Sequence, residues 1–282
     1  MLCAATKWKG WREGGLGEER AVSLLPGLCS VTFRRLPAED IVRLASASSI
    51  TAIEWGGDVH VPHGCVDEAR EVAEMCAAEH IRCSSYGSYL FAGLVQGSDE
   101  IVAVLETARA LAAPNVRVWC AGGGPDPDAG LRLEIVRQLG EICEQARSRD
   151  LTVSLEFHQN TLTETAASTL AVLREVDAPN LFTYWQPVGD APSDRLLAEL
   201  GNVLDDLSHV HVFHWGNGVR LPLADGAGMW PAALRAASAA GGRWEGQRVA
   251  LLEFVQDDDP ACFERDADTL RRWLSAVGEG AP

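Results

Sequence analysis

The chain of 282 residues lacks several features that would point to common classes of function. It has no stretch of about 18 apolar residues, so the sequence predicts no membrane-spanning helix. Its first residues have no continuous apolar run of the kind that a secretory signal needs. Basic residues are scarce: 24 Lys and Arg stand against 40 Asp and Glu, which gives a net charge of −16 with no local basic patch. Such a charge repels phosphate backbones, so nucleic acid is not an expected partner.

The sequence also has no C-x-x-C motif, although it contains eight cysteines. Most of them lie inside apolar runs, which indicates reduced, buried thiols in place of disulfides or a thiolate metal cluster. The eight positions are Cys3, Cys29, Cys65, Cys76, Cys83, Cys120, Cys143 and Cys262. Together with the missing signal, these thiols predict a cytoplasmic protein.

Residues 1–25 show neither helical nor strand periodicity, and we expect a flexible tail there. Trp8 and Trp11 lie in this stretch among Gly, Lys and Glu, so a lid over a site is the alternative. A single domain is expected over residues 26–278.

From that point the chain alternates between short β-rich runs and amphipathic helical patterns. The eight apolar runs begin at Leu28, Ile50, Ile81, Val116, Thr152, Phe182, His209 and Val249. Their mean spacing is about 32 residues, the length of a strand–loop–helix–loop unit. The intervening helical patterns cover 38–47, 66–79, 98–112, 131–148, 164–175, 193–200, 229–240 and 260–276.

Eight such units predict an α/β protein with a single (β/α)8 TIM barrel. An open doubly wound sheet is the alternative. A dinucleotide-binding version of that sheet would carry G-x-G-x-x-G after its first strand, but Arg34, Arg35 and Leu36 stand there.

Ionisable and polar residues gather at the ends of these runs, where a TIM barrel places its active site. A charged residue in a buried strand is costly unless it is paired or bound to a metal. The residues in question are Glu54, His60, Glu156, His158, Trp185, Gln186, His209, His211, His214 and Glu253. Two carboxylates, an imidazole and a carboxamide from neighbouring strands suit Mn²⁺, Mg²⁺, Co²⁺ or Zn²⁺.

At these positions the chain resembles the xylose-isomerase-like TIM-barrel superfamily of sugar isomerases and epimerases, from about residue 28 to 276. The resemblance rests on Glu156 in SLEFH, His211 in HVHVFH, Glu253 in LLEF, and the stretch RLPLADG that begins at Arg220. Members of the superfamily hold one divalent metal on Glu, Asp, His and Glu from four successive strands.

The resemblance implies that Glu156, Gln186, His211 and Glu253 are the metal ligands, with Mn²⁺ as the expected metal, and that Arg220 holds a substrate oxygen. Two departures stand out: Gln186 takes the place of the Asp, and His214 takes the place of an acidic residue three positions after the metal-binding His. The first leaves fewer carboxylates around the metal.

The mechanism implied by the resemblance is proton transfer through an enediolate. Glu156 and Glu253 would be the catalytic pair on either side of a carbon next to a carbonyl. The residues expected to contact the substrate are Glu54, His60, His158, Trp185, His214, Trp215 and Arg220.

We therefore expect a metal-dependent isomerase or epimerase acting on a small sugar or polyol-like carbonyl compound. The same residues can expel a β-hydroxyl, so a dehydratase or lyase acting on a keto-cyclitol or keto-sugar is the alternative. A non-catalytic sugar-binding protein with a degenerate metal site is the third reading. The sequence leaves open whether the protein forms a homo-oligomer. The net negative charge argues against the DNA-repair nucleases of the superfamily.

Overall fold

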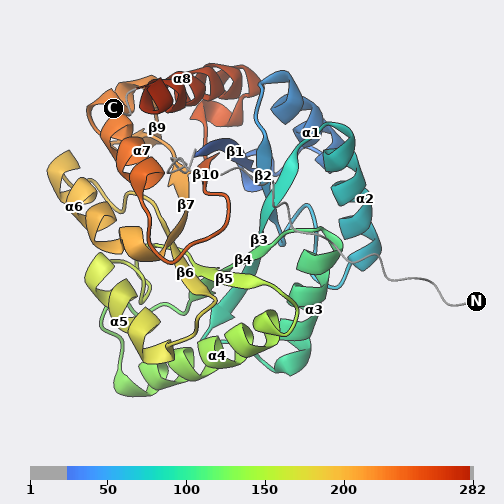
Figure 1. Ribbon diagram of the computed structural model, residues 1–282, viewed down its shortest axis with the longest axis vertical. Coiled ribbons are helices and arrows are strands. Elements are labelled where there is room, and N and C mark those ends of the chain that lie inside the picture. Colours follow the sequence, from blue (N-terminus) through green and yellow to red (C-terminus); the bar gives the residue numbers. More distant parts are fainter. Residues whose placement is uncertain (1–23, 280–282) are drawn as a thin grey trace, which may run out of the picture.

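The computed structural model describes residues 24–279, and these form a closed barrel of eight parallel strands surrounded by eight helices (Figure 1). The strands of the barrel are β1 (Leu25–Cys29), β2 (Ala52–Gly56), β3 (Arg82–Ala92), β4 (Asn115–Cys120), β5 (Thr152–Leu155), β6 (Leu181–Trp185), β7 (Leu207–Val212) and β10 (Val249–Leu252). Neighbours pair in chain order, and β1 pairs with both β2 and β10 to close the ring. The predicted TIM barrel is confirmed.

The helices lie outside the strands, as right-handed crossovers between parallel strands require. They are α1 (Ala38–Ala47), α2 (Val66–Ala78), α3 (Ser98–Ala110), α4 (Ala129–Arg147), α5 (Ala166–Val176), α6 (Ser193–Val203), α7 (Trp230–Ala239) and α8 (Pro260–Glu279). Side-chain caps fix the start of two of these helices. Asp128 accepts hydrogen bonds from the backbone N–H groups of Gly130 and Leu131 at the start of α4, and Thr165 forms a capping box with Ser168 at the start of α5.

The first strand differs from the prediction. The apolar run 28–33 was expected to be a strand, but β1 ends at Cys29 and residues Ser30–Phe33 form a 3-10 helix, η1. Two polar side chains of η1 explain the change. Ser30 Oγ accepts a hydrogen bond from the Gly56 N–H at 2.9 Å, and Thr32 Oγ1 accepts one from the Phe254 N–H at 3.3 Å. The segment therefore crosses the barrel end between β2 and β10.

Pro26 and Gly27 belong to β1, although a Pro-Gly pair favours a turn. Close packing inside the barrel requires the glycine, because a Cβ on Gly27 would lie 2.5 Å from Val249 Cγ1. Tertiary packing therefore overrides the local turn signal at this point.

The core has two parts. The larger cluster fills the space between strands and helices, and a smaller one lies inside the barrel, with Cys29, Tyr184 and Leu251 among its members. Towards the other end of the barrel interior, the buried Nδ1 of His209 accepts a hydrogen bond from the backbone N–H of Val249 at 3.1 Å. Burial lowers the pKa of His209 to about 3, with the charge of Arg248 acting in the same direction.

Three further observations concern expectations from the sequence. The cysteines at positions 29–262 are all free, four of them buried and three half-buried, whereas Cys3 lies outside the described residues. The expected tail, residues 1–25, lies outside them as well, apart from the buried Leu24 and from Leu25 at the start of β1. Among residues 24–279, no helix is long and apolar enough to cross a membrane.

Candidate active site

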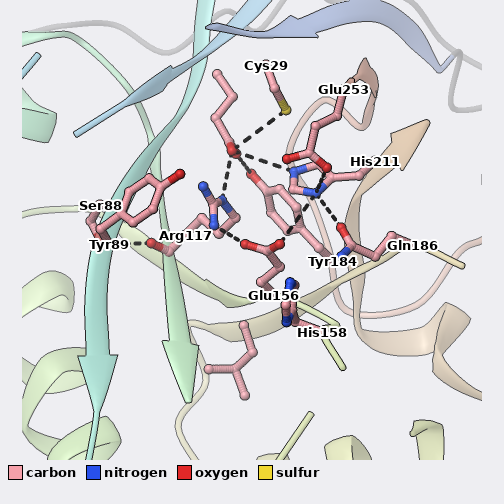
Figure 2. A network of polar contacts seen from close by, with 12 residues as sticks. Cys29, Ser88, Tyr89, Arg117, Glu156, His158, Tyr184, Gln186, His211 and Glu253 are labelled. Atoms are coloured by element: carbon pink, nitrogen blue, oxygen red, sulfur yellow. Dashed lines mark hydrogen bonds and ion pairs between the residues drawn. The ribbon is translucent and has the colours of Figure 1, made fainter. Parts of the chain in front are cut away.

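His211 lies at the centre of a polar cluster in which side chains from several strands meet (Figure 2). It belongs to β7 and is fully buried. Its Nδ1 donates to Gln186 Oε1 at 2.6 Å and lies 3.4 Å from Glu253 Oε2 and 4.0 Å from Glu156 Oε1. Gln186, Glu253 and Glu156 each directly follow a strand: β6, β10 and β5. The structure therefore brings together the four side chains that the sequence predicted as metal ligands.

Glu54, from β2, approaches the other edge of the imidazole, with its Oε1 3.6 Å from Nε2 of His211. It is held there by Arg117 Nε, Ser85 Oγ and the Tyr184 hydroxyl, each donating to a Glu54 oxygen at 2.8 Å. Burial raises the pKa of Glu54, but the Arg117 guanidinium and its other donors outweigh burial and hold this pKa far below its usual range. Glu54 is therefore a fixed anion.

Arg117 on β4 connects two of the three carboxylates. Its Nε donates to Glu54 and its Nη1 to Glu156, and all three side chains are buried. The Tyr89 ring also lies against it, with the guanidinium carbon 5.7 Å from the ring centre. Sequence reasoning missed Arg117, although it carries a charge inside the apolar run VRVWCA, and a charge there requires a partner.

Glu253 is the carboxylate that no described Arg or Lys contacts. Burial, followed by the charges of Glu156 and Glu54, raises the pKa of Glu253 to about 7 against the opposing effects of His211 and Arg117. Burial lowers the pKa of His211, but the negative charge of Glu253 and the nearby Glu54 and Glu156 outweigh it, so this pKa is raised. A carboxyl group with a pKa near neutrality can both take up and release a proton under physiological conditions.

The residues fit a divalent cation. His211 Nε2 and Glu253 Oε2 are buried, and neither atom has a hydrogen-bond partner anywhere in residues 24–279. With all three carboxylates ionised and His211 neutral, Glu54, Glu156, Glu253 and Arg117 carry two net negative charges, which is the charge that one dication balances. The donors are carboxylate, imidazole and carboxamide, which together suit Mn²⁺, Co²⁺ or Zn²⁺. Cys29 Sγ lies in the same group, within 4.8 Å of a ligand atom of His211 and of Glu253.

A cavity of about 520 Å³ opens beside the cluster. It meets the cluster at Gln186 and is otherwise lined by residues that follow β5, β6, β7 and β10, including His158, His214, Trp215 and Phe254. His158 packs against Trp119 with ring centres 4.2 Å apart. Three of the residues predicted to contact substrate, His158, His214 and Trp215, therefore border this space.

Arg220 lies one layer behind this wall. A two-stranded hairpin, β8 (Trp215–Gly216) and β9 (Val219–Arg220), places it opposite Trp215. Its guanidinium carbon lies 5.5 Å from the Trp215 ring and 4.9 Å from the Phe254 ring, and Asp258 accepts a hydrogen bond from it. In this arrangement Arg220 supports two aromatic walls of the cavity.

Other expected substrate residues do not reach the cavity. The Trp185 side chain is fully buried and packs against Trp230 with ring centres 5.9 Å apart. His60 contacts Ser30 Oγ and the Phe33 carbonyl oxygen, at 2.9 and 3.3 Å, in the η1 segment. Glu54 lies within the buried cluster, not on the cavity wall.

Comparison with known proteins identifies the family of this barrel. A family model described as "Xylose isomerase-like TIM barrel" matches residues 42–273. The chain belongs to this family. The family resemblance noted from the strand-end motifs is thereby confirmed.

One curated relative is a 3-dehydroshikimate dehydratase from Bacillus anthracis, 30% identical over 163 residues, which cover 55% of this chain and 58% of the relative. The match thus spans somewhat more than half the length of that protein. Among solved structures, the probable 3-DHS dehydratase AsbF of Bacillus anthracis superposes with a TM-score of 0.74 at 19% identity, covering 88% of this chain and 99% of the other.

Two further structures have similar barrels. A D-allulose 3-epimerase from Methylomonas sp. gives a TM-score of 0.69 at 15% identity, covering 89% of this chain and 98% of the other. A xylose isomerase-like TIM barrel protein from Mycobacterium smegmatis, in complex with magnesium, gives 0.66 at 16% identity, covering 91% and 99%. At such identities these structures establish the fold, and named proteins that share it include a dehydratase, an epimerase and a metal-bound member.

Proposed function

We propose that the protein is a metal-dependent dehydratase that removes the proton next to the carbonyl of a polyhydroxylated ring or sugar and expels a β-hydroxyl as water. The observation that carries this proposal is the unequal state of its glutamates. Arg117 binds Glu54 and Glu156, whereas Glu253 has no guanidinium partner among residues 24–279 and keeps a buried oxygen without a hydrogen-bond partner there.

His211, Glu253 and Glu156 are the proposed metal-binding residues, and their oxygen and nitrogen donors are compatible with Mn²⁺, Mg²⁺, Co²⁺ and Zn²⁺. When bound, such a metal polarises the substrate carbonyl and acidifies the adjacent C–H bond. Gln186 Oε1 only accepts hydrogen bonds, so Nδ1 of His211 carries the proton that joins them. We therefore assign Gln186 to orienting the imidazole, as partners of metal-binding histidines commonly do.

The proposed reaction is a single elimination. A Glu253 oxygen takes the proton from the carbon next to the carbonyl, and the electron pair of that C–H bond becomes the new C=C bond. The C–O bond to the β-hydroxyl breaks, and this group leaves with a proton as water. His158 and His214 line the cavity and are the proposed donors of that second proton.

The inequality between the glutamates supports elimination over epimerisation. An epimerase that uses two carboxylates needs one on each face of the same carbon, with each able to exchange a proton. Here the Arg117 guanidinium occupies Glu156 Oε2. An elimination needs one carboxylate base, and Glu253 is the carboxylate left free of guanidinium for this role. The 30% identity to a dehydratase over 163 residues adds support.

An isomerase or epimerase is the second candidate. Glu156 and Glu253 approach the same His211 nitrogen from different strands, with oxygens 4.0 and 3.4 Å from it. Two carboxylates around one centre are what a proton transfer through an enediolate uses. The similar barrel of the D-allulose 3-epimerase supports this candidate at the level of the fold.

The test combines metal analysis with deuterium exchange and product mass. Purified protein is assayed with Mn²⁺ in D₂O on 3-dehydroshikimate and on D-allulose, the compounds named by the relatives. We expect about one metal ion per chain and a product of 3-dehydroshikimate that has lost one water. Glu253→Gln should abolish both deuterium exchange and turnover, and Glu264→Gln, an exposed position on α8, should leave them unchanged.

Each alternative has its own signature in this test. Deuterium incorporation without a change in product mass beyond the label would support the isomerase or epimerase. Unchanged exchange in Glu253→Gln would refute Glu253 as the base. Binding of either compound with neither metal nor exchange would support the non-catalytic reading.

A further inference from the structure

Cys29 occupies a position that the proposed reaction leaves unexplained. It is the last residue of β1, is fully buried, and pairs in register with Glu54 of β2. Its Sγ lies 3.9 Å from Glu54 Oε1, and Figure 2 shows Cys29 beside Glu253 and His211. The thiol is thus directed into the carboxylate cluster, away from the helices outside the barrel.

The hydrogen bond between Gln186 and His211 identifies which imidazole nitrogen is available to a metal. Because Nδ1 donates to Gln186, the lone pair of the neutral ring lies on Nε2. This Nε2 is buried and has no hydrogen-bond partner within the described part of the chain. It faces Glu54, which also contacts the thiol of Cys29.

A second unpartnered atom lies in the same cluster, 3.4 Å from the Nδ1 edge of the imidazole. Glu253 Oε2 is buried and accepts no hydrogen bond from any described residue. Ligand atoms of Cys29, His211 and Glu253 all lie within 4.8 Å of one another. Around a tetrahedral zinc ion with Zn–S of about 2.3 Å and Zn–N and Zn–O of about 2.0–2.2 Å, ligand atoms are roughly 3–4 Å apart, so small side-chain shifts suffice.

We propose that Cys29 is a ligand of the metal, and that together with His211 Nε2 and Glu253 it makes this a sulfur-containing site selective for Zn²⁺ or Co²⁺ over Mg²⁺ and Mn²⁺. This inference rests on the proposed metal site and deepens it. Thiolate is a soft ligand that favours Zn²⁺, whereas carboxylate and carbonyl oxygens suit Mg²⁺ and Mn²⁺. The charge of a bound metal deprotonates a coordinating thiol, so no other base is required.

Cobalt spectroscopy tests the inference independently of catalysis. The metal-free full-length protein is titrated with Co²⁺, and the spectrum is recorded in the visible range and the near ultraviolet. We expect a near-ultraviolet charge-transfer band from thiolate to cobalt together with the visible bands of the bound ion. Cys29→Ser should lose the near-ultraviolet band and keep the visible bands. Cys120→Ser, at another buried cysteine that ends strand β4, is the matched control and should retain both.

Affinity provides a second readout. In competition with a chelator, Cys29→Ser should weaken Zn²⁺ binding by more than the roughly 10- to 100-fold that loss of an outer-shell partner costs. Its affinity for Mn²⁺ should change much less. Cys29→Ala serves the same purpose if the serine variant does not fold, as judged by circular dichroism.

The outcomes separate this inference from the proposed function. A thiolate band that disappears only with Cys29 supports it. Cobalt bound without a thiolate band, or with a band that persists in Cys29→Ser, overturns the role of Cys29 and leaves the metal-dependent dehydratase intact. No cobalt or zinc binding by the unmodified protein overturns this inference and the proposed metal site together.

Discussion

Replacing Arg117 by Met should destabilise the protein strongly, because it removes the cation that two buried carboxylates share. Glu54 and Glu156 are 2% and 3% exposed, so neither can recover its charge stabilisation from water. Breaking a buried ion pair by removing one partner costs about 3–5 kcal/mol. Met fills much of the volume of the Arg side chain, and Glu54 keeps its bonds from Ser85 and Tyr184. Because of this retained volume and these hydrogen bonds, we expect the free energy of unfolding to fall by no more than about 3–5 kcal/mol.

The assay is urea unfolding of the metal-free protein at neutral pH, followed by circular dichroism. Arg132→Met is the control: it removes a partly exposed ion pair with Glu175, and such pairs contribute about 0–1 kcal/mol. Adding Glu54→Gln to Arg117→Met should recover part of the loss, because one unpaired charge disappears with it.

The pH dependence of the free energy of unfolding checks whether the loss in Arg117→Met comes from the ion pair. Arg117 holds the pKa of Glu54 below its usual range, so the stabilisation from this pair is present above the usual carboxyl pKa and is lost as the pH falls towards the folded value. The difference between Arg117→Met and the unmodified protein should therefore be largest at neutral pH and shrink in acid. A loss no larger than that of Arg132→Met at neutral pH would refute the reasoning.

The remaining predictions concern other buried and cavity-lining groups. His209, with a pKa of about 3 in place of the usual 6.5, stays neutral in the folded protein while the unfolded chain takes up a proton, so stability should fall as the pH drops below about 6.5. His209→Gln should reduce that slope in urea unfolding, whereas His63→Gln, at an exposed position, should not. Trp215→Ala should raise KM with little change in melting temperature, because Trp215 lines the cavity. Trp185→Ala should instead lower the melting temperature, since removal of a buried Trp costs about 3–5 kcal/mol; the reverse pattern would contradict the placement of the two rings.

The sequence predicted the barrel well because its evidence is repetitive. Each helix must bury an apolar face and each strand must be mostly apolar, so the pattern recurs eight times and no single unit decides the result. The bounds of α1, 38–47, were predicted without error. The start of β1 at Leu25 was not predicted, because the Pro-Gly pair at 26–27 favours a turn. The close packing of Gly27 against Val249 explains why these two residues belong to the strand.

The candidate site was predicted in part, for a related reason. Strand ends meet at one face of a barrel, so Glu156, Gln186, His211 and Glu253 could be expected to converge. Arg117 and Cys29 were missed because one lies in the middle of its strand and the other was taken for an ordinary buried thiol. Trp185 and His60 belong to strand ends or their loops, but the direction in which a side chain points there depends on local register, which sequence periodicity does not fix near a chain turn.

Arg117 also explains how three chemically identical side chains acquire different roles. In the sequence, Glu54, Glu156 and Glu253 each end an apolar run, and in the structure each is buried. One guanidinium on β4 can bind only its nearest neighbours, and it contacts Glu54 and Glu156. Glu253 is left with burial and two like charges, which raise its pKa to about 7 and leave an oxygen without a partner in the described structure. Arg117 thus sets Glu253 apart by binding the other two glutamates and leaving Glu253 without a guanidinium contact.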